Sequence, residues 1–225
     1  MVTVILTKYK RPEIFEEQYE SVISQSLPVS EILICDNTKQ NTGVWSRFSL
    51  ALLSKNPFVC VIDDDTIPGN KWLENCLNSF NKQEGLYGTC GYLFNSNTHY
   101  ENNYLRHGWC NPNNDILKVD YVVHNWFFKR DWLKYFWSDI RDPKYWLCGE
   151  DMNFSYQLQR QGIGTYVPPH PKDDQSFWGS IKGWEYGTDN NSLWELNPNN
   201  FRSSMFEFFN NQIKQGWKLQ YELRN

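Results

Sequence analysis

The first 95 residues alternate short apolar runs with helical patterns, and this alternation narrows the possible folds more than any other feature of the sequence. Four of the apolar runs have the length and composition of β-strands: Val2–Leu6, Glu31–Cys35, Phe58–Ile62 and Gly85–Tyr92. Apolar residues at helical spacing separate them, as in residues 12–23, 44–53 and 72–80. Strands that alternate with helices over short connections predict an α/β fold with parallel neighbouring strands.

The second half of the chain is less regular. It predicts strands at Val119–Val123, Trp126–Phe128 and Thr165–Val167, and helices at Arg130–Trp137, Glu150–Gln161 and Phe201–Leu223. Long loops are expected over residues 94–116 and 172–200. With no repeat and no clear linker, we expect residues 1–225 to form a single α/β domain around a mixed, mainly parallel central sheet flanked by helices.

Charge and composition exclude some classes of protein. The net charge is −4 with 22 Lys and Arg, and no basic run is present, which argues against nucleic acid as a partner. No stretch resembles a signal peptide or a membrane span, so we expect a cytoplasmic location. The six cysteines are scattered and favour free thiols in a reducing compartment. Aromatic residues reach 17%, enough either to fill a core or to line a cleft for flat ligands.

Three consecutive carboxylates, Asp63–Asp65, directly follow the third predicted strand. In α/β sheets ligands bind beyond the carboxyl ends of the strands, and Asp36 ends the strand before. Clustered carboxylates repel one another, and Mg²⁺ or Mn²⁺ would relieve that repulsion because hard cations prefer oxygen ligands. The alternative for Asp63–Asp65 is a solvated acidic turn.

These segments resemble the GT-A fold of nucleotide-sugar-dependent glycosyltransferases. Residues 2–13 look like the first strand and turn of that family, 31–37 like its second strand, and Asp63–Asp65 like its DxD motif. Gly149-Glu150-Asp151 is similar to the motif that supplies the catalytic base in the large inverting family 2. Three later segments resemble the exostosin-like branch of this fold, whose enzymes retain the anomeric configuration of the sugar: Val119–Phe128, Pro168–Pro171 and Trp178-Gly179-Ser180. The chain is also similar to small glycosyltransferase domains of large algal viruses.

The resemblance implies a UDP-sugar donor, a glycan acceptor, and a division into a nucleotide-binding half (1–95) and an acceptor and catalytic half (96–225). It implies that Asp36 reads the uracil base, although Asp36-Asn37 could equally form an Asx turn. The other implied donor-binding residues are Thr7, Tyr9, Arg11, Arg47, Asp63 and Asp64. Asp65 is the implied ligand of Mn²⁺ or Mg²⁺. His170 is either a second ligand, a role for which Asp173 and Asp174 compete, or merely a residue of a rigid loop.

Asp151 is implied as the general base, with Glu150 beside it to orient the acceptor. An inverting transferase needs a carboxylate that takes the proton of the attacking hydroxyl group. Acids in the first turn of a helix are also favoured by the helix dipole alone. Inversion is preferred, and a retaining, exostosin-like reaction stays open.

The aromatic residues divide into two groups. The expected core group sits at helical spacing: Trp72, Trp132, Phe206 and Phe209. Five tryptophans in or beside the loops that flank the site are candidates for contact with the acceptor, with Trp126 and Trp178 foremost: Trp109, Trp126, Trp146, Trp178 and Trp184. Residues 172–191 could form a lid that orders when the donor binds. A nucleotidyltransferase is less favoured because no glycine-rich loop follows the first strand, and a carbohydrate-binding module would leave the acidic strand ends unexplained.

Overall fold

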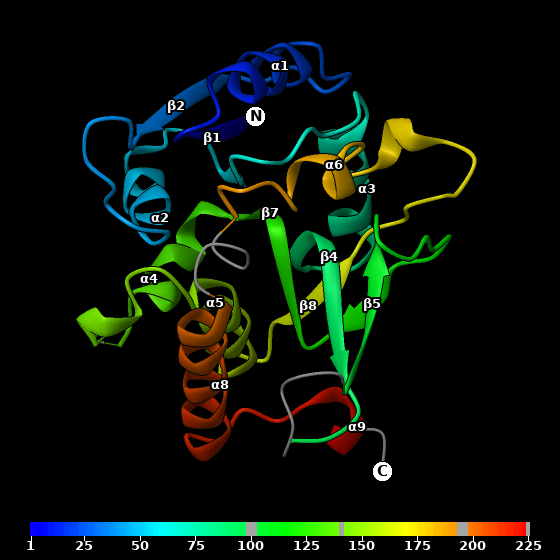
Figure 1. Ribbon diagram of the computed structural model, residues 1–225. Helices are drawn as coiled ribbons and strands as arrows, with labels where there is room; N and C mark the ends of the chain where they lie inside the picture. The colour runs from blue at the N-terminus through cyan, green and yellow to red at the C-terminus, as the bar shows by residue number, and fades with distance from the viewer. Residues whose placement is uncertain (98–102, 140–141, 193–197, 224–225) are drawn as a thin grey trace.

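The computed structural model describes residues 1–97, 103–139, 142–192 and 198–223 (Figure 1). These residues form one mixed eight-stranded sheet in the order β2-β1-β3-β7-β4-β8-β6, with β5 also paired to β4. The strands are β1 (Val2–Lys8), β2 (Glu31–Asp36), β3 (Phe58–Ile62), β4 (Gly85–Phe94), β5 (Tyr104–Gly108), β6 (Leu117–Val119), β7 (Tyr121–Lys129) and β8 (Gly164–Val167). The helices are α1 (Pro12–Ile23), α2 (Ser46–Leu50), α3 (Trp72–Lys82), α4 (Leu133–Phe136), α5 (Glu150–Gln159), α6 (Gly183–Tyr186), α8 (Pro198–Lys214) and α9 (Gln220–Leu223).

The expected fold class is confirmed: the chain is an α/β protein with a mixed, mainly parallel sheet flanked by helices. β1 pairs in parallel with β2 and β3, and β4 pairs in parallel with β8. Of the described strands, β1, β2, β3, β4 and β8 run in one direction, and β5, β6 and β7 run in the other. The parallel group β2-β1-β3 lies at one end of the sheet, and its strands β2 and β1 are at the top of Figure 1.

The order of the strands in the sheet differs from their order along the chain. β7 lies antiparallel between β3 and β4, so β4 is not a neighbour of β3 (Figure 1). Residues 121–129 thereby bring the second half of the chain beside the carboxyl end of β3. The site at this edge therefore draws residues from both halves, which the periodicity of the first 95 residues could not reveal.

Several expected elements need correction. β2 is an edge strand rather than a buried one, and the side chain of its Ile34 is 46% exposed. The expected loop over residues 94–116 contains β5, which pairs with the far half of β4. The two strands expected at Val119–Val123 and Trp126–Phe128 are one continuous strand, β7, and only Val119 belongs to β6. The C-terminal helix ends at Lys214, before Gly216 adopts φ 103°, and α9 follows separately.

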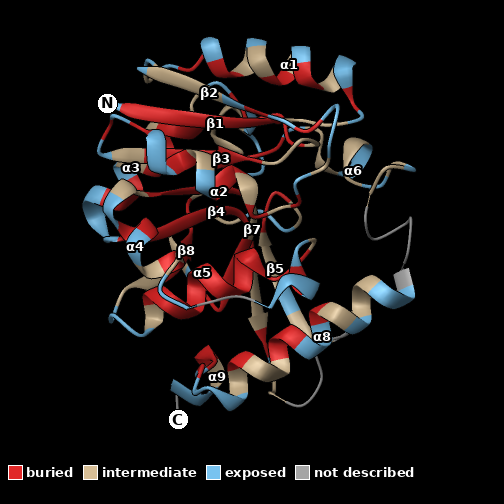
Figure 2. Ribbon diagram, turned by 90° about the vertical axis from the view of Figure 1, so that its left-hand side faces the viewer, coloured by how far each residue is buried: buried red, intermediate tan, exposed pale blue. Residues whose placement is uncertain are grey.

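The core lies along β1, β3, β4 and β7, whose buried residues run through the middle of the molecule (Figure 2). Aromatic rings fill much of it, and Phe48 of α2 stacks on Phe136 of α4 with 4.5 Å between the ring centroids. Trp72, Trp132 and Phe209 are buried as expected, whereas Phe206 is 41% exposed on α8. None of the described helices combines the length and apolar character needed to cross a bilayer.

Candidate functional site

A cavity of about 600 Å³ opens at the carboxyl ends of β1 and β3. Such a volume lies within the range of pockets that hold small ligands. It is lined by most of the residues that the sequence singled out: Thr7, Tyr9, Arg11, Arg47, Asp63, Asp64, Asp65, Trp126, Glu150 and Asp151. The structure thus brings the acidic end of β3 and the acidic start of α5 into one wall, although 85 or more residues separate them in sequence.

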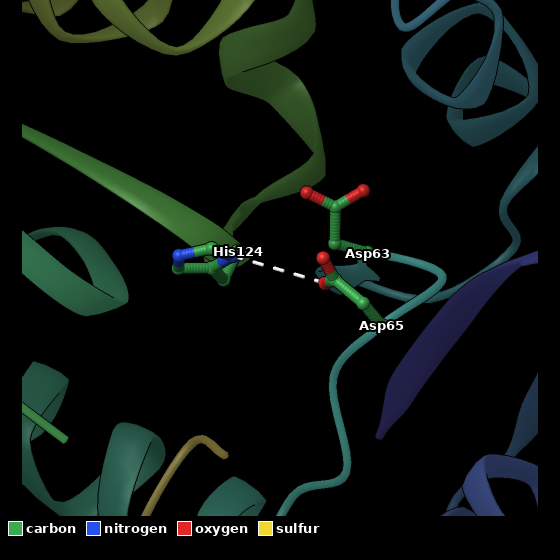
Figure 3. Close-up of side chains that lie close together, drawn as sticks. All are labelled: Asp63, Asp65 and His124. Atoms are coloured by element: carbon green, nitrogen blue, oxygen red, sulfur yellow. Dashed lines mark ion pairs between the residues drawn. The ribbon is translucent and has the colours of Figure 1, made fainter. Parts of the chain in front are cut away.

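Asp63, Asp65 and His124 form a group that could bind a divalent metal ion, and we call it the ligand group (Figure 3). One ligand atom of each residue lies within 4.8 Å of the others. His124 Nδ1 is 3.9 Å from Asp65 Oδ1. Two carboxylates and an imidazole are oxygen and nitrogen donors that suit first-row divalent cations.

His124 enters the cavity because of an irregularity in β7. The β4–β7 register pairs Gly88 with Trp126 but Cys90 with Val123, so β7 contains one extra residue and forms a bulge. His124 has φ 75°, an uncommon conformation for a residue other than glycine. Its carbonyl oxygen accepts a hydrogen bond from the Asp63 amide at 2.8 Å, which places it beside the end of β3. No pattern in the sequence announces a bulge, so this residue was missed.

The three carboxylates of Asp63–Asp65 differ in their partners. Arg47 forms an ion pair with Asp63, and Arg11 forms one with Asp64 at 2.7 Å. Burial would raise the pKa of Asp63, but Arg47, together with His124 and Arg11, outweighs burial and holds this pKa below its usual range. Among the described residues, Asp65 contacts His124 and accepts a hydrogen bond from the Thr66 hydroxyl at 3.1 Å. Burial and the Asp63 charge raise the pKa of Asp65, as expected for a carboxylate that lacks a guanidinium partner.

Arg47 connects the two acidic parts of the cavity. Its Nη2 donates to Glu150 Oε1 at 2.7 Å, while its Nη1 donates to Asp63. The guanidinium carbon lies 4.6 Å from the centroid of the Trp126 ring, in a cation–π contact. Because Arg47 is 4% exposed, its charge acts in a medium of low polarity and orders both carboxylates strongly.

Arg11, just before α1, joins a different pair of carboxylates. Its Nη1 donates to Asp64, and its Nε and Nη2 donate to the two carboxylate oxygens of Asp189 at 2.9 and 2.5 Å. Burial and the neighbouring Asp65 and Asp63 charges raise the pKa of Asp64 to about 7 in spite of Arg11. Asp189 belongs to residues 183–192, which we call the cover segment because most of them line the cavity.

Glu150 and Asp151 open α5, where Gly149 adopts φ 84°. A Cβ atom at Gly149 would lie 2.7 Å from the Phe208 ring, so both the conformation and the packing require glycine. Asp151 Oδ1 accepts a hydrogen bond from the Met152 amide at 2.7 Å, and Asp151 is 7% exposed. Burial, followed by the Glu150 charge, raises the pKa of Asp151 well above its usual range. Such a carboxylate is suited to accept a proton.

Three of the predicted site residues do not line the cavity: Asp36, Trp178 and His170. Asp36 is exposed and accepts from the Thr38 amide and hydroxyl at 2.9 and 2.6 Å, which is the Asx turn that the sequence left open. Its neighbour Asn37 lines the cavity instead. Trp178 donates its indole N–H to the Pro171 carbonyl at 2.8 Å and is not among the lining residues.

His170 is fully buried and does not belong to the ligand group. Its Nδ1 lies 2.8 Å from the Pro168 carbonyl oxygen, and its Nε2 accepts from the Gly179 amide at 3.2 Å. Burial lowers its pKa to about 4, so the ring is neutral at pH 7. Both ring nitrogens therefore hold loop backbone together, and His124 occupies the place in the ligand group that the sequence analysis gave to His170.

Part of the cavity lining is aromatic, and we call it the aromatic wall: Tyr92, Tyr104, Trp109 and Trp184. Trp109 and Trp184 were expected near the acceptor from the sequence, whereas Tyr92 and Tyr104 were not, and the expected Trp146 is 45% exposed and does not line the cavity. Trp109 contacts Trp184 with 4.8 Å between ring centroids and His124 with 5.7 Å. Trp126 also lines the cavity, but its ring is 1% exposed and lies against Arg47. The sequence therefore predicted an aromatic cleft and three of its tryptophans, but not its tyrosines.

No protein-family model and no curated protein matches the chain. Among solved structures, the chain is similar to A197 from STIV, with 16% identity and a TM-score of 0.45 over 76% of this chain and 83% of that one. A TM-score of 0.45 is too low for this likeness to carry an argument about the site.

Proposed function

We propose that this chain is a metal-dependent glycosyltransferase of the GT-A type, which moves a sugar from a UDP-sugar donor to a hydroxyl group of a glycan acceptor. The observation that carries the proposal is that Asp63–Asp65 and Glu150-Asp151 line the same cavity. In the family that the sequence resembles, the first motif binds the donor and the second supplies the catalytic base. A carbohydrate-binding module would not need two acidic clusters joined by the buried Arg47.

The donor would occupy the side of the cavity formed by the strand ends. Thr7, Tyr9 and Asn37 line this side and are our candidates for contact with the base and ribose. Arg11 and Arg47 bring two buried guanidinium groups to the cavity, and guanidinium groups bind phosphate oxygens through paired hydrogen bonds. Asp36 is not retained as the residue that reads the base, because its carboxylate is engaged in the Asx turn with Thr38.

Asp63, Asp65 and His124 would hold the divalent cation, for which Mn²⁺ and Mg²⁺ are our candidates. Their donor set fits such an ion, since the ligand atoms lie close together and Asp65 lacks a guanidinium partner among the described residues. When bound, the ion would stabilise the negative charge that develops on the departing diphosphate. Because His124 comes from β7, the division into a nucleotide-binding half and a catalytic half is not strict in this proposal.

Asp151 would act as the general base. The Met152 amide orients its carboxylate, and burial together with Glu150 makes it more basic than an exposed carboxylate. In our proposal it takes the proton of the acceptor hydroxyl while that oxygen attacks the anomeric carbon from the face opposite the diphosphate. This reaction inverts the configuration. Glu150 is held by Arg47 and would keep Asp151 in place rather than exchange protons.

The proposal is tested by measuring UDP release from a panel of UDP-sugars in the presence of Mn²⁺ and mixed glycan acceptors. We expect the wild type to release UDP from at least one donor. Asp151→Asn should lower that rate at least about 100-fold while leaving UDP affinity nearly unchanged, because it removes a proton acceptor and little volume. Asp173→Asn, which alters an exposed carboxylate outside the cavity wall, is the control. Failure of every donor, or full turnover by Asp151→Asn, would contradict the proposal.

A further inference from the structure

Two cysteines meet beside the cavity. Cys90 lies on β4, Cys110 lies in the turn after β5, and their sulfur atoms are 2.9 Å apart. Cys90 is buried and Cys110 is partly exposed, whereas the other four cysteines are all buried. The pair therefore combines sulfur–sulfur contact with access from solvent at one member only.

The turn that carries Cys110 is short and well defined. The Gly108 amide donates to the Asn111 carbonyl, and the Asn111 amide donates to the Gly108 carbonyl, both at 3.0 Å. Trp109 and Cys110 are the two residues at its tip. The Trp109 ring packs against His124 and Trp184 in the aromatic wall described above. A covalent bond at Cys110 would thus act on the residue next to Trp109.

The electrostatic surroundings favour reaction at Cys110. A hydrogen bond with Cys90 lowers the pKa of the Cys110 thiol, and the positive charge of Arg106 on β5 lowers it further. Burial raises the pKa of Cys90 well above its usual range. The reactive form of a cysteine is the thiolate, so Cys110 is the nucleophile of the pair and Cys90 the resolving thiol.

We propose that Cys90 and Cys110 are an oxidisable pair, and that a peroxide converts them into a disulfide that ties the Trp109 turn to β4. The Cys110 thiolate attacks one peroxide oxygen, the O–O bond breaks, and a sulfenic acid forms while hydroxide leaves and takes up a proton. The Cys90 sulfur then attacks the Cys110 sulfur, the S–O bond breaks, and water leaves. Two thiols are oxidised and one peroxide is reduced to two waters. The inference does not depend on the proposed transferase activity.

Peptide mapping tests the linkage directly. Trypsin cleaves after Arg106 and Lys118, so Cys90 falls in peptide 83–106 and Cys110 in peptide 107–118. After exposure of the native protein to hydrogen peroxide, we expect these two peptides to be joined under non-reducing conditions and separated by dithiothreitol. The number of free thiols should fall by two. Cys110→Ser should abolish the linkage, and Cys35→Ser, a cysteine on β2, should not.

Amide hydrogen exchange tests the effect on the turn. Oxidation should slow exchange at residues 108–111 about tenfold in the wild type and leave it unchanged in Cys110→Ser, because tethering opposes local opening. The proposal is overturned if peroxide leaves the two peptides unlinked, if Cys110 proceeds to a sulfinic acid without joining Cys90, or if linkage leaves exchange unaltered. The wild-type mapping needs no variant, so a folding defect in a mutant cannot obscure the result.

Discussion

Arg47 and Glu150 lie 103 residues apart in sequence, yet Arg47 Nη2 donates to Glu150 Oε1 at 2.7 Å. The same guanidinium group also pairs with Asp63 at the end of β3. One buried cation therefore connects the ligand group to the start of α5, where Asp151 lies.

Replacing Arg47 by methionine should destabilise the fold by about 3 kcal/mol. The variant leaves Glu150 and Asp63 without their cation, and removal of one partner of a buried ion pair costs about 3–5 kcal/mol. We use the lower end because the Asp63 side chain is 26% exposed. The measurement is the free energy of unfolding in urea at pH 7. Arg47→Met combined with Glu150→Gln should recover part of the loss, and a loss below about 1 kcal/mol for the single variant would contradict this role.

His124→Asn should weaken Mn²⁺ binding about tenfold without a large loss of stability. Asparagine tolerates positive φ, so the bulge in β7 can persist while the imidazole is removed. Isothermal titration with Mn²⁺ alone measures the effect, and thermal unfolding checks the fold. His124→Val provides the contrast, because a branched side chain is strained at φ 75° and should lower the unfolding temperature as well. Unchanged Mn²⁺ affinity in His124→Asn would remove His124 from the ligand group.

Asp151→Asn should make the protein more stable than the wild type at alkaline pH. The pKa of Asp151 is raised in the fold by burial and by Glu150, so the fold favours the protonated form. That contribution to stability is complete below the pKa of an unfolded aspartate and is lost as the pH rises through the raised value. Asparagine does not titrate, and the difference between the two proteins should therefore grow with pH. Urea unfolding at several pH values measures it, and a constant difference would show that Asp151 does not titrate in this way.

Asp189→Asn should strengthen UDP binding about threefold, since an ion pair of a partly exposed carboxylate contributes about 1 kcal/mol or less. In the structure the Asp189 carboxylate occupies Arg11 through two hydrogen bonds, and a phosphate group would compete with it for the same guanidinium. The same variant should make the cover segment more sensitive to proteases. Asp173→Asn is the matched control in the same region of the chain. Weaker UDP binding in Asp189→Asn would mean that Asp189 supports the donor site rather than competes for it.

The sequence predicts the first parallel strands of the sheet. It does not predict the order of the strands where a strand pairs with partners far away in the sequence. Val2–Leu6 and Phe58–Ile62 are apolar enough to identify buried strands, and the acidic residues after Phe58–Ile62 indicate the position of the cavity. The place of β7 between β3 and β4 depends on contacts far apart in sequence, which periodicity does not encode. The bulge at His124 follows from that placement and could not be predicted, whereas Trp109 and Trp184 of the aromatic wall were predicted because they lie in or beside aromatic-rich loops.

The histidine of the ligand group could not be predicted for the same reason. The sequence predicts His170, which lies between prolines, as a metal ligand. It does not predict His124, which lies between two expected strands. In the folded chain His170 is buried with both ring nitrogens in backbone contacts, and His124 faces the carboxylates. Residue type and spacing identify candidates, but the direction of a side chain is set by tertiary structure.

The central claim is that the cavity binds UDP through a divalent cation held by the ligand group. Its most direct test is calorimetric titration of the wild type with UDP, with and without Mn²⁺, alongside Asp65→Ala. We expect Mn²⁺ to strengthen UDP binding at least about tenfold in the wild type and to have little effect in Asp65→Ala, because this variant removes a carboxylate of the ligand group that forms no ion pair with a guanidinium group in the described part of the chain. Binding of UDP that ignores Mn²⁺ in the wild type, or that gains equally from Mn²⁺ in Asp65→Ala, would contradict the claim.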